Sequence, residues 1–308
     1  MEFGPHVAPA GLAAIINLEV PTDPAVWEEV VRPWAEGGVA ALASGAVERL
    51  LAAPALTTRN LARNTEPLGL PGTPWGSLSV EPEDRRRSGP LYAWTKPTWA
   101  KFLKALGENP RHLGVSFCSL DEEGFSGGGV TFRLAAGLGV LPRGWGALTL
   151  FQKPVGDAER DDVAQRWVDF VRDFVSSVPV PVAFGSIDQD LSVYQTPFEE
   201  STRTRFGGAL GTGFLRGYSW VTIVGASAME RIGGIEALRS SGAFVSVDEV
   251  GFGSVMVQAT ERLSDYDEEA VRRVFEALAP ALPAGKAHPT FDARARLVLR
   301  DAAEVAPR

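Results

Sequence analysis

The chain has 308 residues, of which 45% are hydrophobic and 22% charged, as in an ordinary globular protein. Its net charge of −8 argues against a nucleic-acid binder, which needs Lys and Arg clustered along one face. The single cysteine, Cys118, excludes an internal disulfide. No basic start precedes the first apolar run, and no run of about 18 apolar residues occurs. We therefore expect neither a secretory signal nor a membrane span, and a cytoplasmic location.

The first half of the chain carries weak signals. Residues 12–20 favour a strand, and Asp23 should cap a helix that begins at Pro24. Residues 97–106 favour a short helix, and residues 113–120 and 130–135 flank three glycines, which favours a β-hairpin. The stretch 54–90 is rich in Pro, Gly and Arg, including Arg85-Arg86-Arg87, and we expect a long surface excursion there.

The second half is easier to interpret. Residues 147–152 and 180–187 favour strands, and the helix predicted between them, 159–178, has apolar residues at spacings of three and four. A strand over 217–224 should lead into a helix whose start is marked by Ser227 and Glu230, the spacing of a capping box. Gly233-Gly234 should break that helix. A hairpin of 244–250 with 254–260 and a helix over 265–278 follow, and we expect the tail 283–308 to lie outside the core.

This order predicts an α+β fold with antiparallel or mixed sheets and packed helices. Residues 1–285 should form one domain, and residues 286–308 a C-terminal tail. Both halves, about 10–140 and 145–285, show a strand and a helix followed by a hairpin. Two structurally similar, ferredoxin-like β-α-β-β-α halves are therefore possible.

The sequence contains a candidate catalytic motif. Gly124-Phe125-Ser126-Gly127-Gly128 fits G-x-S-x-G, which in hydrolases is a strained turn from a strand into a helix. The residues after it, 130–135, favour a strand, so a glycine-rich hairpin tip explains the motif better. Of the three histidines, His6, His112 and His288, the last completes an acceptable chain order with Ser126 and Asp265. Cys118 lies in the middle of a predicted strand and is expected to be a packing residue.

Metal and phosphate sites find little support. Zinc-ligand spacings of Cys and His are absent from the sequence. Asp188-Gln189-Asp190 has a D-x-D pattern, but two carboxylates alone make a weak cation site, and a polar turn after a strand is expected. The glycine-rich stretch 207–213 precedes a strand, whereas a dinucleotide loop follows a strand and opens a helix. We expect a loop at 207–213, and no metal or cofactor.

A resemblance to a known family begins in the block 215–225 (LRGYSWVTIVG), which runs into 229–234 (MERIGG) and 237–239 (ALR). Together with 145–152, the helix containing Trp167 and Phe170, the segment 181–185 (PVAFG) and 279–283 (APALP), this block resembles the type VI immunity family of bacterial proteins (TsiV-like). The resemblance covers about residues 95–285. It implies an immunity protein that neutralises a cognate toxin by stoichiometric binding without turnover, in the cytoplasm, and it supplies no catalytic residues.

A binding protein of this kind needs a surface that complements its partner. The candidate partner-binding residues are two acidic sets, Asp265, Asp267, Glu268 and Glu269, and Asp121, Glu122 and Glu123. The first set also suits a helix start, where Asp265 and Glu268 would make a capping pair. Two other functions remain open, a serine hydrolase using Ser126 and a small-molecule-binding α+β module.

Overall fold

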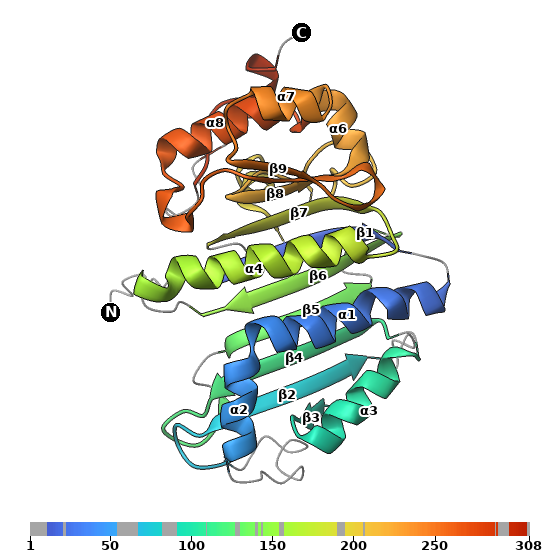
Figure 1. Ribbon diagram of the computed structural model, residues 1–308, viewed down its shortest axis with the longest axis vertical. Helices are drawn as coiled ribbons and strands as arrows, with labels where there is room; N and C mark the ends of the chain where they lie inside the picture. The colour runs from blue at the N-terminus through green and yellow to red at the C-terminus, as the bar shows by residue number, and fades with distance from the viewer. Residues whose placement is uncertain are drawn as a thin grey trace.

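A computed structural model describes residues 11–20, 23–53, 67–81, 91–108, 110–126, 130–138, 141–142, 144–153, 157–189, 195–205, 207–286, 288 and 296–306. The strands are β1 (Leu12–Glu19), β2 (Pro74–Glu81), β3 (Leu91–Ala93), β4 (His112–Ser119), β5 (Val130–Leu138), β6 (Trp145–Gln152), β7 (Val182–Gln189), β8 (Val221–Val224), β9 (Ser246–Glu249) and β10 (Val255–Gln258). They form one antiparallel sheet in the order β3-β2-β4-β5-β6-β1-β7-β8-β10-β9 (Figure 1).

β1, the first described strand of the chain, lies between two later strands in the middle of this sheet. β1 pairs with β6 on one side and with β7 on the other, although both neighbours come more than 120 residues later in the chain. β6 in turn pairs with β5. The division into two similar halves remains a prediction, but the strands on the two sides of β1 belong to one continuous sheet.

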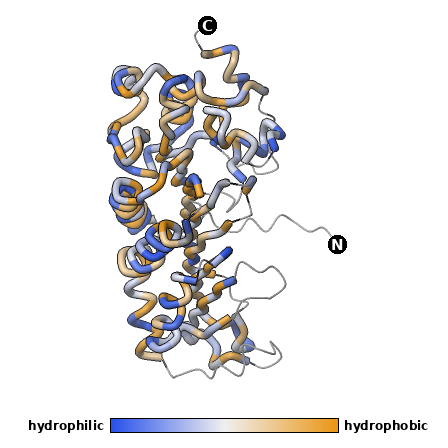
Figure 2. Tube along the Cα trace, turned by 90° about the vertical axis from the view of Figure 1, so that its right-hand side faces the viewer, coloured by the Kyte–Doolittle hydropathy of each residue, from blue (hydrophilic) through white to orange (hydrophobic). Residues whose placement is uncertain are grey.

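The helices are α1 (Pro24–Leu42), α2 (Ser44–Ala52), α3 (Lys96–Leu106), α4 (Asp157–Ser177), α5 (Pro197–Ser201), α6 (Ala226–Ile232), α7 (Ile235–Ser240) and α8 (Glu268–Leu278). α1 to α4 lie on one side of the sheet, and α6, α7 and α8 gather around its β8-β10-β9 end (Figure 1). Figure 2, turned by 90°, shows the described helices of the β2–β6 region on one side only. The fold is α+β, as the sequence predicted.

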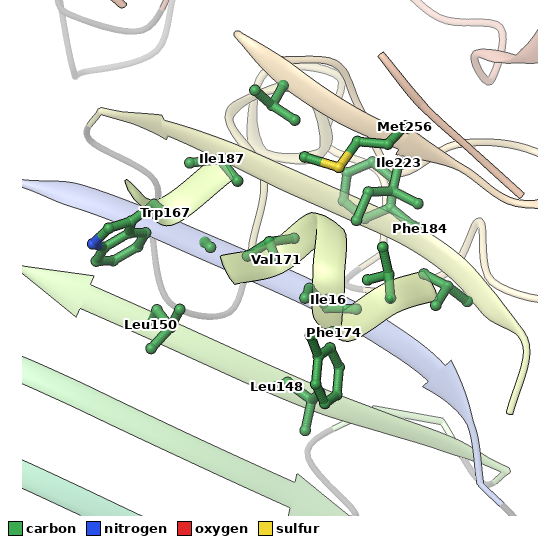
Figure 3. Close-up of a cluster of buried hydrophobic side chains, with 14 of the residues drawn as sticks. Ile16, Leu148, Leu150, Trp167, Val171, Phe174, Phe184, Ile187, Ile223 and Met256 are labelled. Atoms are coloured by element: carbon green, nitrogen blue, oxygen red, sulfur yellow. The ribbon is translucent and has the colours of Figure 1, made fainter. Parts of the chain in front are cut away.

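A large part of the core lies between the sheet and the first four helices. α1 packs against α4 through Trp34, whose ring centroid lies 5.4 Å from that of Phe170 and 5.0 Å from that of Phe174. The indole N–H of Trp34 donates to the carbonyl of Ala135 at 3.1 Å, so its polar atom is satisfied inside the core. Figure 3 shows the α4 side chains Trp167, Val171 and Phe174 over the side chains of the central strands.

Several predicted elements are confirmed. Asp23 caps α1 through its side chain, with Pro24 in the first turn. β4 pairs with β5, and β9 pairs with β10 around a turn in which Phe252 and Gly253 have positive φ. Gly233 ends α6 in the left-handed conformation (φ 95°), which explains the predicted break.

The surface excursion expected over 54–90 is wrong at its centre. Residues 74–81 form β2, which pairs with β4 and β3 inside the sheet. Leu78 and Val80 alternate into the core, while Ser77 and Ser79 point to the other face. Proline at the first residue of a strand is tolerated, because its missing N–H lies outside the ladder. Arg85, Arg86 and Arg87 lie outside the described residues.

The predicted first residues of one strand and of one helix are also wrong. The strand predicted over 217–224 begins at Val221, because side chains bind the preceding backbone: Asp188 accepts from the N–H of Trp220, and Thr222 accepts from that of Ser219. α6 has Gly225 as its N-cap without a side-chain bond, so Ser227 and Glu230 form no capping box.

The C-terminal end of the chain corrects two further expectations. Asp267 caps α8 and accepts from the N–H of Ala270, so Asp265 makes no capping pair with Glu268. The tail is not wholly outside the core. Ala302 is fully buried, and the N–H of Val298 donates to the hydroxyl of Tyr218 at 2.8 Å.

Candidate functional site

The face of β2, β4, β5 and β6 that points away from the helices is organised in three rows of cross-strand neighbours. The first row is Ser77, Ser116, Arg133 and Phe151, the middle row is Ser79, Gly114, Ala135 and Thr149, and the third row is Glu81, His112, Gly137 and Ala147. Residues between the rows, such as Leu78, Val115 and Leu134, point into the core. This strict alternation follows from the two-residue period of a strand.

The middle row contains only small residues, and it forms the floor of a hollow of about 280 Å³. Arg133 and His112 line the hollow from the first and third rows, and Leu91 of β3 contributes at the sheet edge. The hollow can therefore hold a small molecule or one side chain of a partner.

Arg133 carries a full positive charge and lines the hollow. Its side chain is exposed, and its guanidinium forms no ion pair or hydrogen bond within the described part of the chain. Arginine presents several N–H donors in a planar fork that matches a carboxylate. An unpaired guanidinium beside hydroxyl groups is therefore suited to a small anion.

His112 adds a neutral polar group. Burial lowers the pKa of His112, an effect that Glu81 opposes and that Arg133 and Arg111 reinforce. Since an ordinary histidine has a pKa of about 6.5, the His112 imidazole is uncharged at neutral pH. It can donate one hydrogen bond and accept another, without adding charge to the hollow.

The hollow is bordered by a buried ion pair. Asn17 of β1 is the cross-strand neighbour of Ala147, and its side-chain carbonyl accepts from Arg216 at 2.8 Å. Arg216 binds both carboxylate oxygens of Glu199, at 2.9 and 2.7 Å. Both side chains of the pair are only 1% exposed. This pair covers the part of the sheet next to the hollow.

Cys118 and Ser126 do not gain catalytic surroundings. Cys118 is buried in a small cluster with Leu68, Trp75 and Leu120, and burial, with a contribution from Asp121, raises its thiol pKa to about 11. At neutral pH the reactive thiolate is therefore scarce. Ser126 is exposed in the connection before β5, which is a strand and not the helix that a nucleophile elbow requires.

The possible triad partners of Ser126 lie elsewhere. Asp265 lies in a turn after β10, where the neighbouring Ser264 donates hydrogen bonds to the Asp161 carboxylate of α4. His288 is exposed, and its backbone N–H donates to the carbonyl of Ser201. His6 and residues 127–129 of the motif lie outside the described residues. Within the described residues, no hydrogen bond or ion pair joins Ser126, Asp265 and His288.

The D-x-D pattern is not a polar turn. Asp188 is a buried residue of β7, whose carboxylate accepts from the N–H groups of Gln189 and Trp220. Asp190 lies outside the described residues. Within the described residues, no group of three or more His, Cys, Asp or Glu side chains is placed to hold a metal ion.

The two acidic sets lie at separate places. Glu122 and Glu123 are exposed after β4, where the Asp121 carboxylate accepts from the N–H groups of Glu123 and Phe125 and so holds the turn. The set Asp265, Asp267, Glu268 and Glu269 is exposed after β10. Asp267 is used as a cap and Glu269 pairs with Arg273. The two sets follow strands that are six positions apart in the sheet, so each is a separate candidate contact surface.

The fold and the hollow define an α+β protein with an antiparallel sheet that carries a polar depression on one face. No protein-family model and no curated protein matches the chain. Among solved structures it is similar to the T6SS protein PA0821 of Pseudomonas aeruginosa, with 16% sequence identity and a TM-score of 0.48. The alignment covers 97% of this chain and 82% of the other. This is a likeness of fold, and the resemblance to the type VI immunity family remains a prediction.

The hollow was not predicted from the sequence. Its signal was present in Ser77, Ser79, Gly114 and Ser116, small residues at alternate positions of two strands, but β2 was not recognised as a strand. The ion pair of Glu199 with Arg216 left no local signal, because its third member, Asn17, is 199 residues from Arg216.

Proposed function

We propose that this protein is an immunity protein, which binds a cognate bacterial toxin in a one-to-one complex and blocks it without turnover. The toxin would belong to a type VI secretion system and act in the cytoplasm, where the immunity protein would also reside. Within the described residues, no helix is long and apolar enough to cross a membrane.

One observation supports the proposal. Residues on which the family resemblance rests form the β8-β10-β9 end of the sheet, around which α6, α7 and α8 gather. Trp220 is 1% exposed and its indole N–H donates to the carbonyl of Thr260 at 3.0 Å. A Cβ at Gly225 would meet the carbonyl of Ala183 at 2.5 Å, so the turn into α6 admits only glycine without a shift. Gly233 supplies the left-handed cap. These residues act through packing geometry, which supports a shared scaffold.

A rigid scaffold suits an inhibitor, because binding then costs little ordering of the inhibitor itself. The acidic sets are the candidate contact surfaces for a basic region of the toxin. Since the two sets follow different strands, β4 and β10, we expect one set to contact the toxin and the other to have little effect.

The test is co-expression with the toxin encoded by the neighbouring gene. We expect a one-to-one complex on size-exclusion chromatography and restored growth of toxin-expressing cells. Two neutralising double variants locate the surface: Glu122→Gln with Glu123→Gln, and Glu268→Gln with Glu269→Gln. One double variant should weaken binding at least tenfold, about 1.4 kcal/mol.

Glu48→Gln on α2 is the matched control, since Glu48 is also exposed and lies outside both sets. It should leave the affinity unchanged. Continued killing with no complex would refute the immunity function. A tight complex that neither double variant weakens would refute the acidic interface while leaving the immunity function in place.

A further inference from the structure

We propose that the hollow over β2, β4, β5 and β6 is a binding site for a carboxylate, held by Arg133, in a molecule whose far end carries an uncharged polar group that contacts His112. The inference goes beyond the proposed function and does not depend on it. The carboxylate can belong to a free organic acid or to an acidic side chain of a protein, and the experiment below separates these two sources.

The first argument is the shape of the site. Ser79, Gly114, Ala135 and Thr149 form a floor without a long side chain, on a sheet face where long side chains would otherwise fill the space. A Cβ at Gly114 would lie 2.8 Å from the hydroxyl oxygen of Ser79 and 3.7 Å from a ring carbon of His112. The absence of that side chain keeps the floor open between β2 and β5.

The second argument is the placement of the two end groups. Arg133 and the cross-strand partner of His112, Gly137, are four residues apart on β5. At about 3.4 Å per residue, the two backbone positions are roughly 14 Å apart along the strand. Both side chains line the same hollow, so they bracket the middle row from opposite ends. An elongated small ligand can therefore contact both.

The charge of the residues that line the hollow favours a ligand with one negative charge. Arg133 brings one positive charge, and His112 stays neutral at neutral pH, so a group with one negative charge balances the lining. A carboxylate carries one charge and matches the guanidinium fork, whereas a phosphate carries nearly two. Glu81, the neighbour of His112 in the third row, disfavours a second negative charge at that end. An uncharged polar group there is consistent with both residues.

The lining of the hollow also contains hydroxyl groups that are not used in hydrogen bonds within the described part of the chain. Ser77, Ser79, Ser116 and Thr149 bring four hydroxyls to the lining. None of them forms a side-chain hydrogen bond within the described part of the chain. Thr149 is only 7% exposed as a residue, yet its hydroxyl is not among the buried unpaired polar atoms of the described residues, so it stays open to the hollow that it lines. A bound carboxylate would accept hydrogen bonds from such groups.

The experiment is a calorimetric titration of the purified full chain with four probes. These are 4-hydroxybutyrate, butyrate, the neutral 1,4-butanediol, and glutamate blocked as its N-acetyl amide, which represents a protein side chain. We expect 4-hydroxybutyrate to bind more tightly than butyrate and the diol not to bind. Arg133→Gln should weaken binding of every carboxylate at least tenfold. His112→Phe should remove the preference for 4-hydroxybutyrate over butyrate and leave butyrate binding intact.

Arg262→Gln is the matched control, an exposed arginine outside the hollow, and should bind as the wild type does. Ala135→Leu should abolish binding by filling the floor, and circular dichroism should show that each variant is folded. Because Arg133 is exposed, its glutamine variant is expected to fold even if the leucine variant does not.

Binding of the blocked glutamate with no binding of the free acids would assign the site to a protein side chain. Binding of the free acids alone would assign it to an organic acid. Diol binding as strong as that of 4-hydroxybutyrate, carboxylate binding unchanged in Arg133→Gln, or equal competition by sulfate would overturn the proposal, as would no binding of any probe.

Discussion

In the described part of the chain, the sheet face that points away from α1 to α4 is covered over β1 and β7 but open over β2 to β6. Over β1 and β7 the segment containing α5 and Arg216 covers the strands, and its charges are satisfied inside the protein. Glu199 accepts from both Arg216 and the N–H groups of Thr196 and Gly207. Over β2 to β6 no described helix covers the face, small residues leave a hollow, and Arg133 is unpaired within the described residues.

One sheet can therefore combine a rigid region of paired buried charges with an open region that is accessible to a ligand. A fully paired buried charge contributes rigidity, because removing either partner leaves the other without compensation. An unpaired charge in an open depression is available to a ligand instead.

The largest effect is expected at the buried pair. Glu199→Gln keeps the side-chain volume but removes the carboxylate that pairs with the buried Arg216 charge, so the free energy of unfolding should fall by about 3–5 kcal/mol. Ser79→Ala in the hollow is the matched change at the other region and should shift it by less than about 1 kcal/mol. Urea denaturation of both variants measures the difference. Equal, small losses would mean that the pair contributes no more than the hollow.

The next effect concerns two glycines in the two regions. Gly225→Ala places a Cβ 2.5 Å from the carbonyl oxygen of Ala183, a backbone atom, and should destabilise the protein by about 1–3 kcal/mol. Gly114→Ala meets the hydroxyl oxygen of Ser79, which can rotate away, and alanine is favoured over glycine in a strand by about 0.5–1 kcal/mol. Thermal unfolding should therefore show a lower Tm for the first variant and an unchanged or higher Tm for the second. The reverse order would contradict the distinction.

The smallest effect is a pH dependence at His112. Its pKa is lowered in the folded protein, mainly by burial, so below pH 6.5 the unfolded chain binds a proton that the folded chain resists. The stabilisation is complete above that pH and is lost as pH falls toward the folded pKa. His112→Gln should thus lose less stability than the wild type between pH 7 and pH 5, measured by urea midpoints. Parallel curves would show that His112 titrates normally.

Local sequence signals predicted many elements because their physical causes are local. Asp23 followed by Pro24 marks a helix start through capping and a fixed φ, and both features occur in α1. The apolar spacing of 159–178 predicted α4 for the same reason. β2 was missed because Pro74 and the surrounding glycines are typical of loops, while the pairing with β4 that makes 74–81 a strand is a tertiary contact.

The sequence by itself determined the α+β class, the interior of most helices and strands, and the residues that pack in the resemblance block. Only the tertiary structure decided that β1 lies between β6 and β7, that Asn17 meets Arg216, and that Arg133 and His112 line one hollow. The physical reason is distance along the chain. Turns, caps and periodicity depend on residues within about one helical turn, whereas cross-strand neighbours are set by the pairing of segments that are remote in sequence.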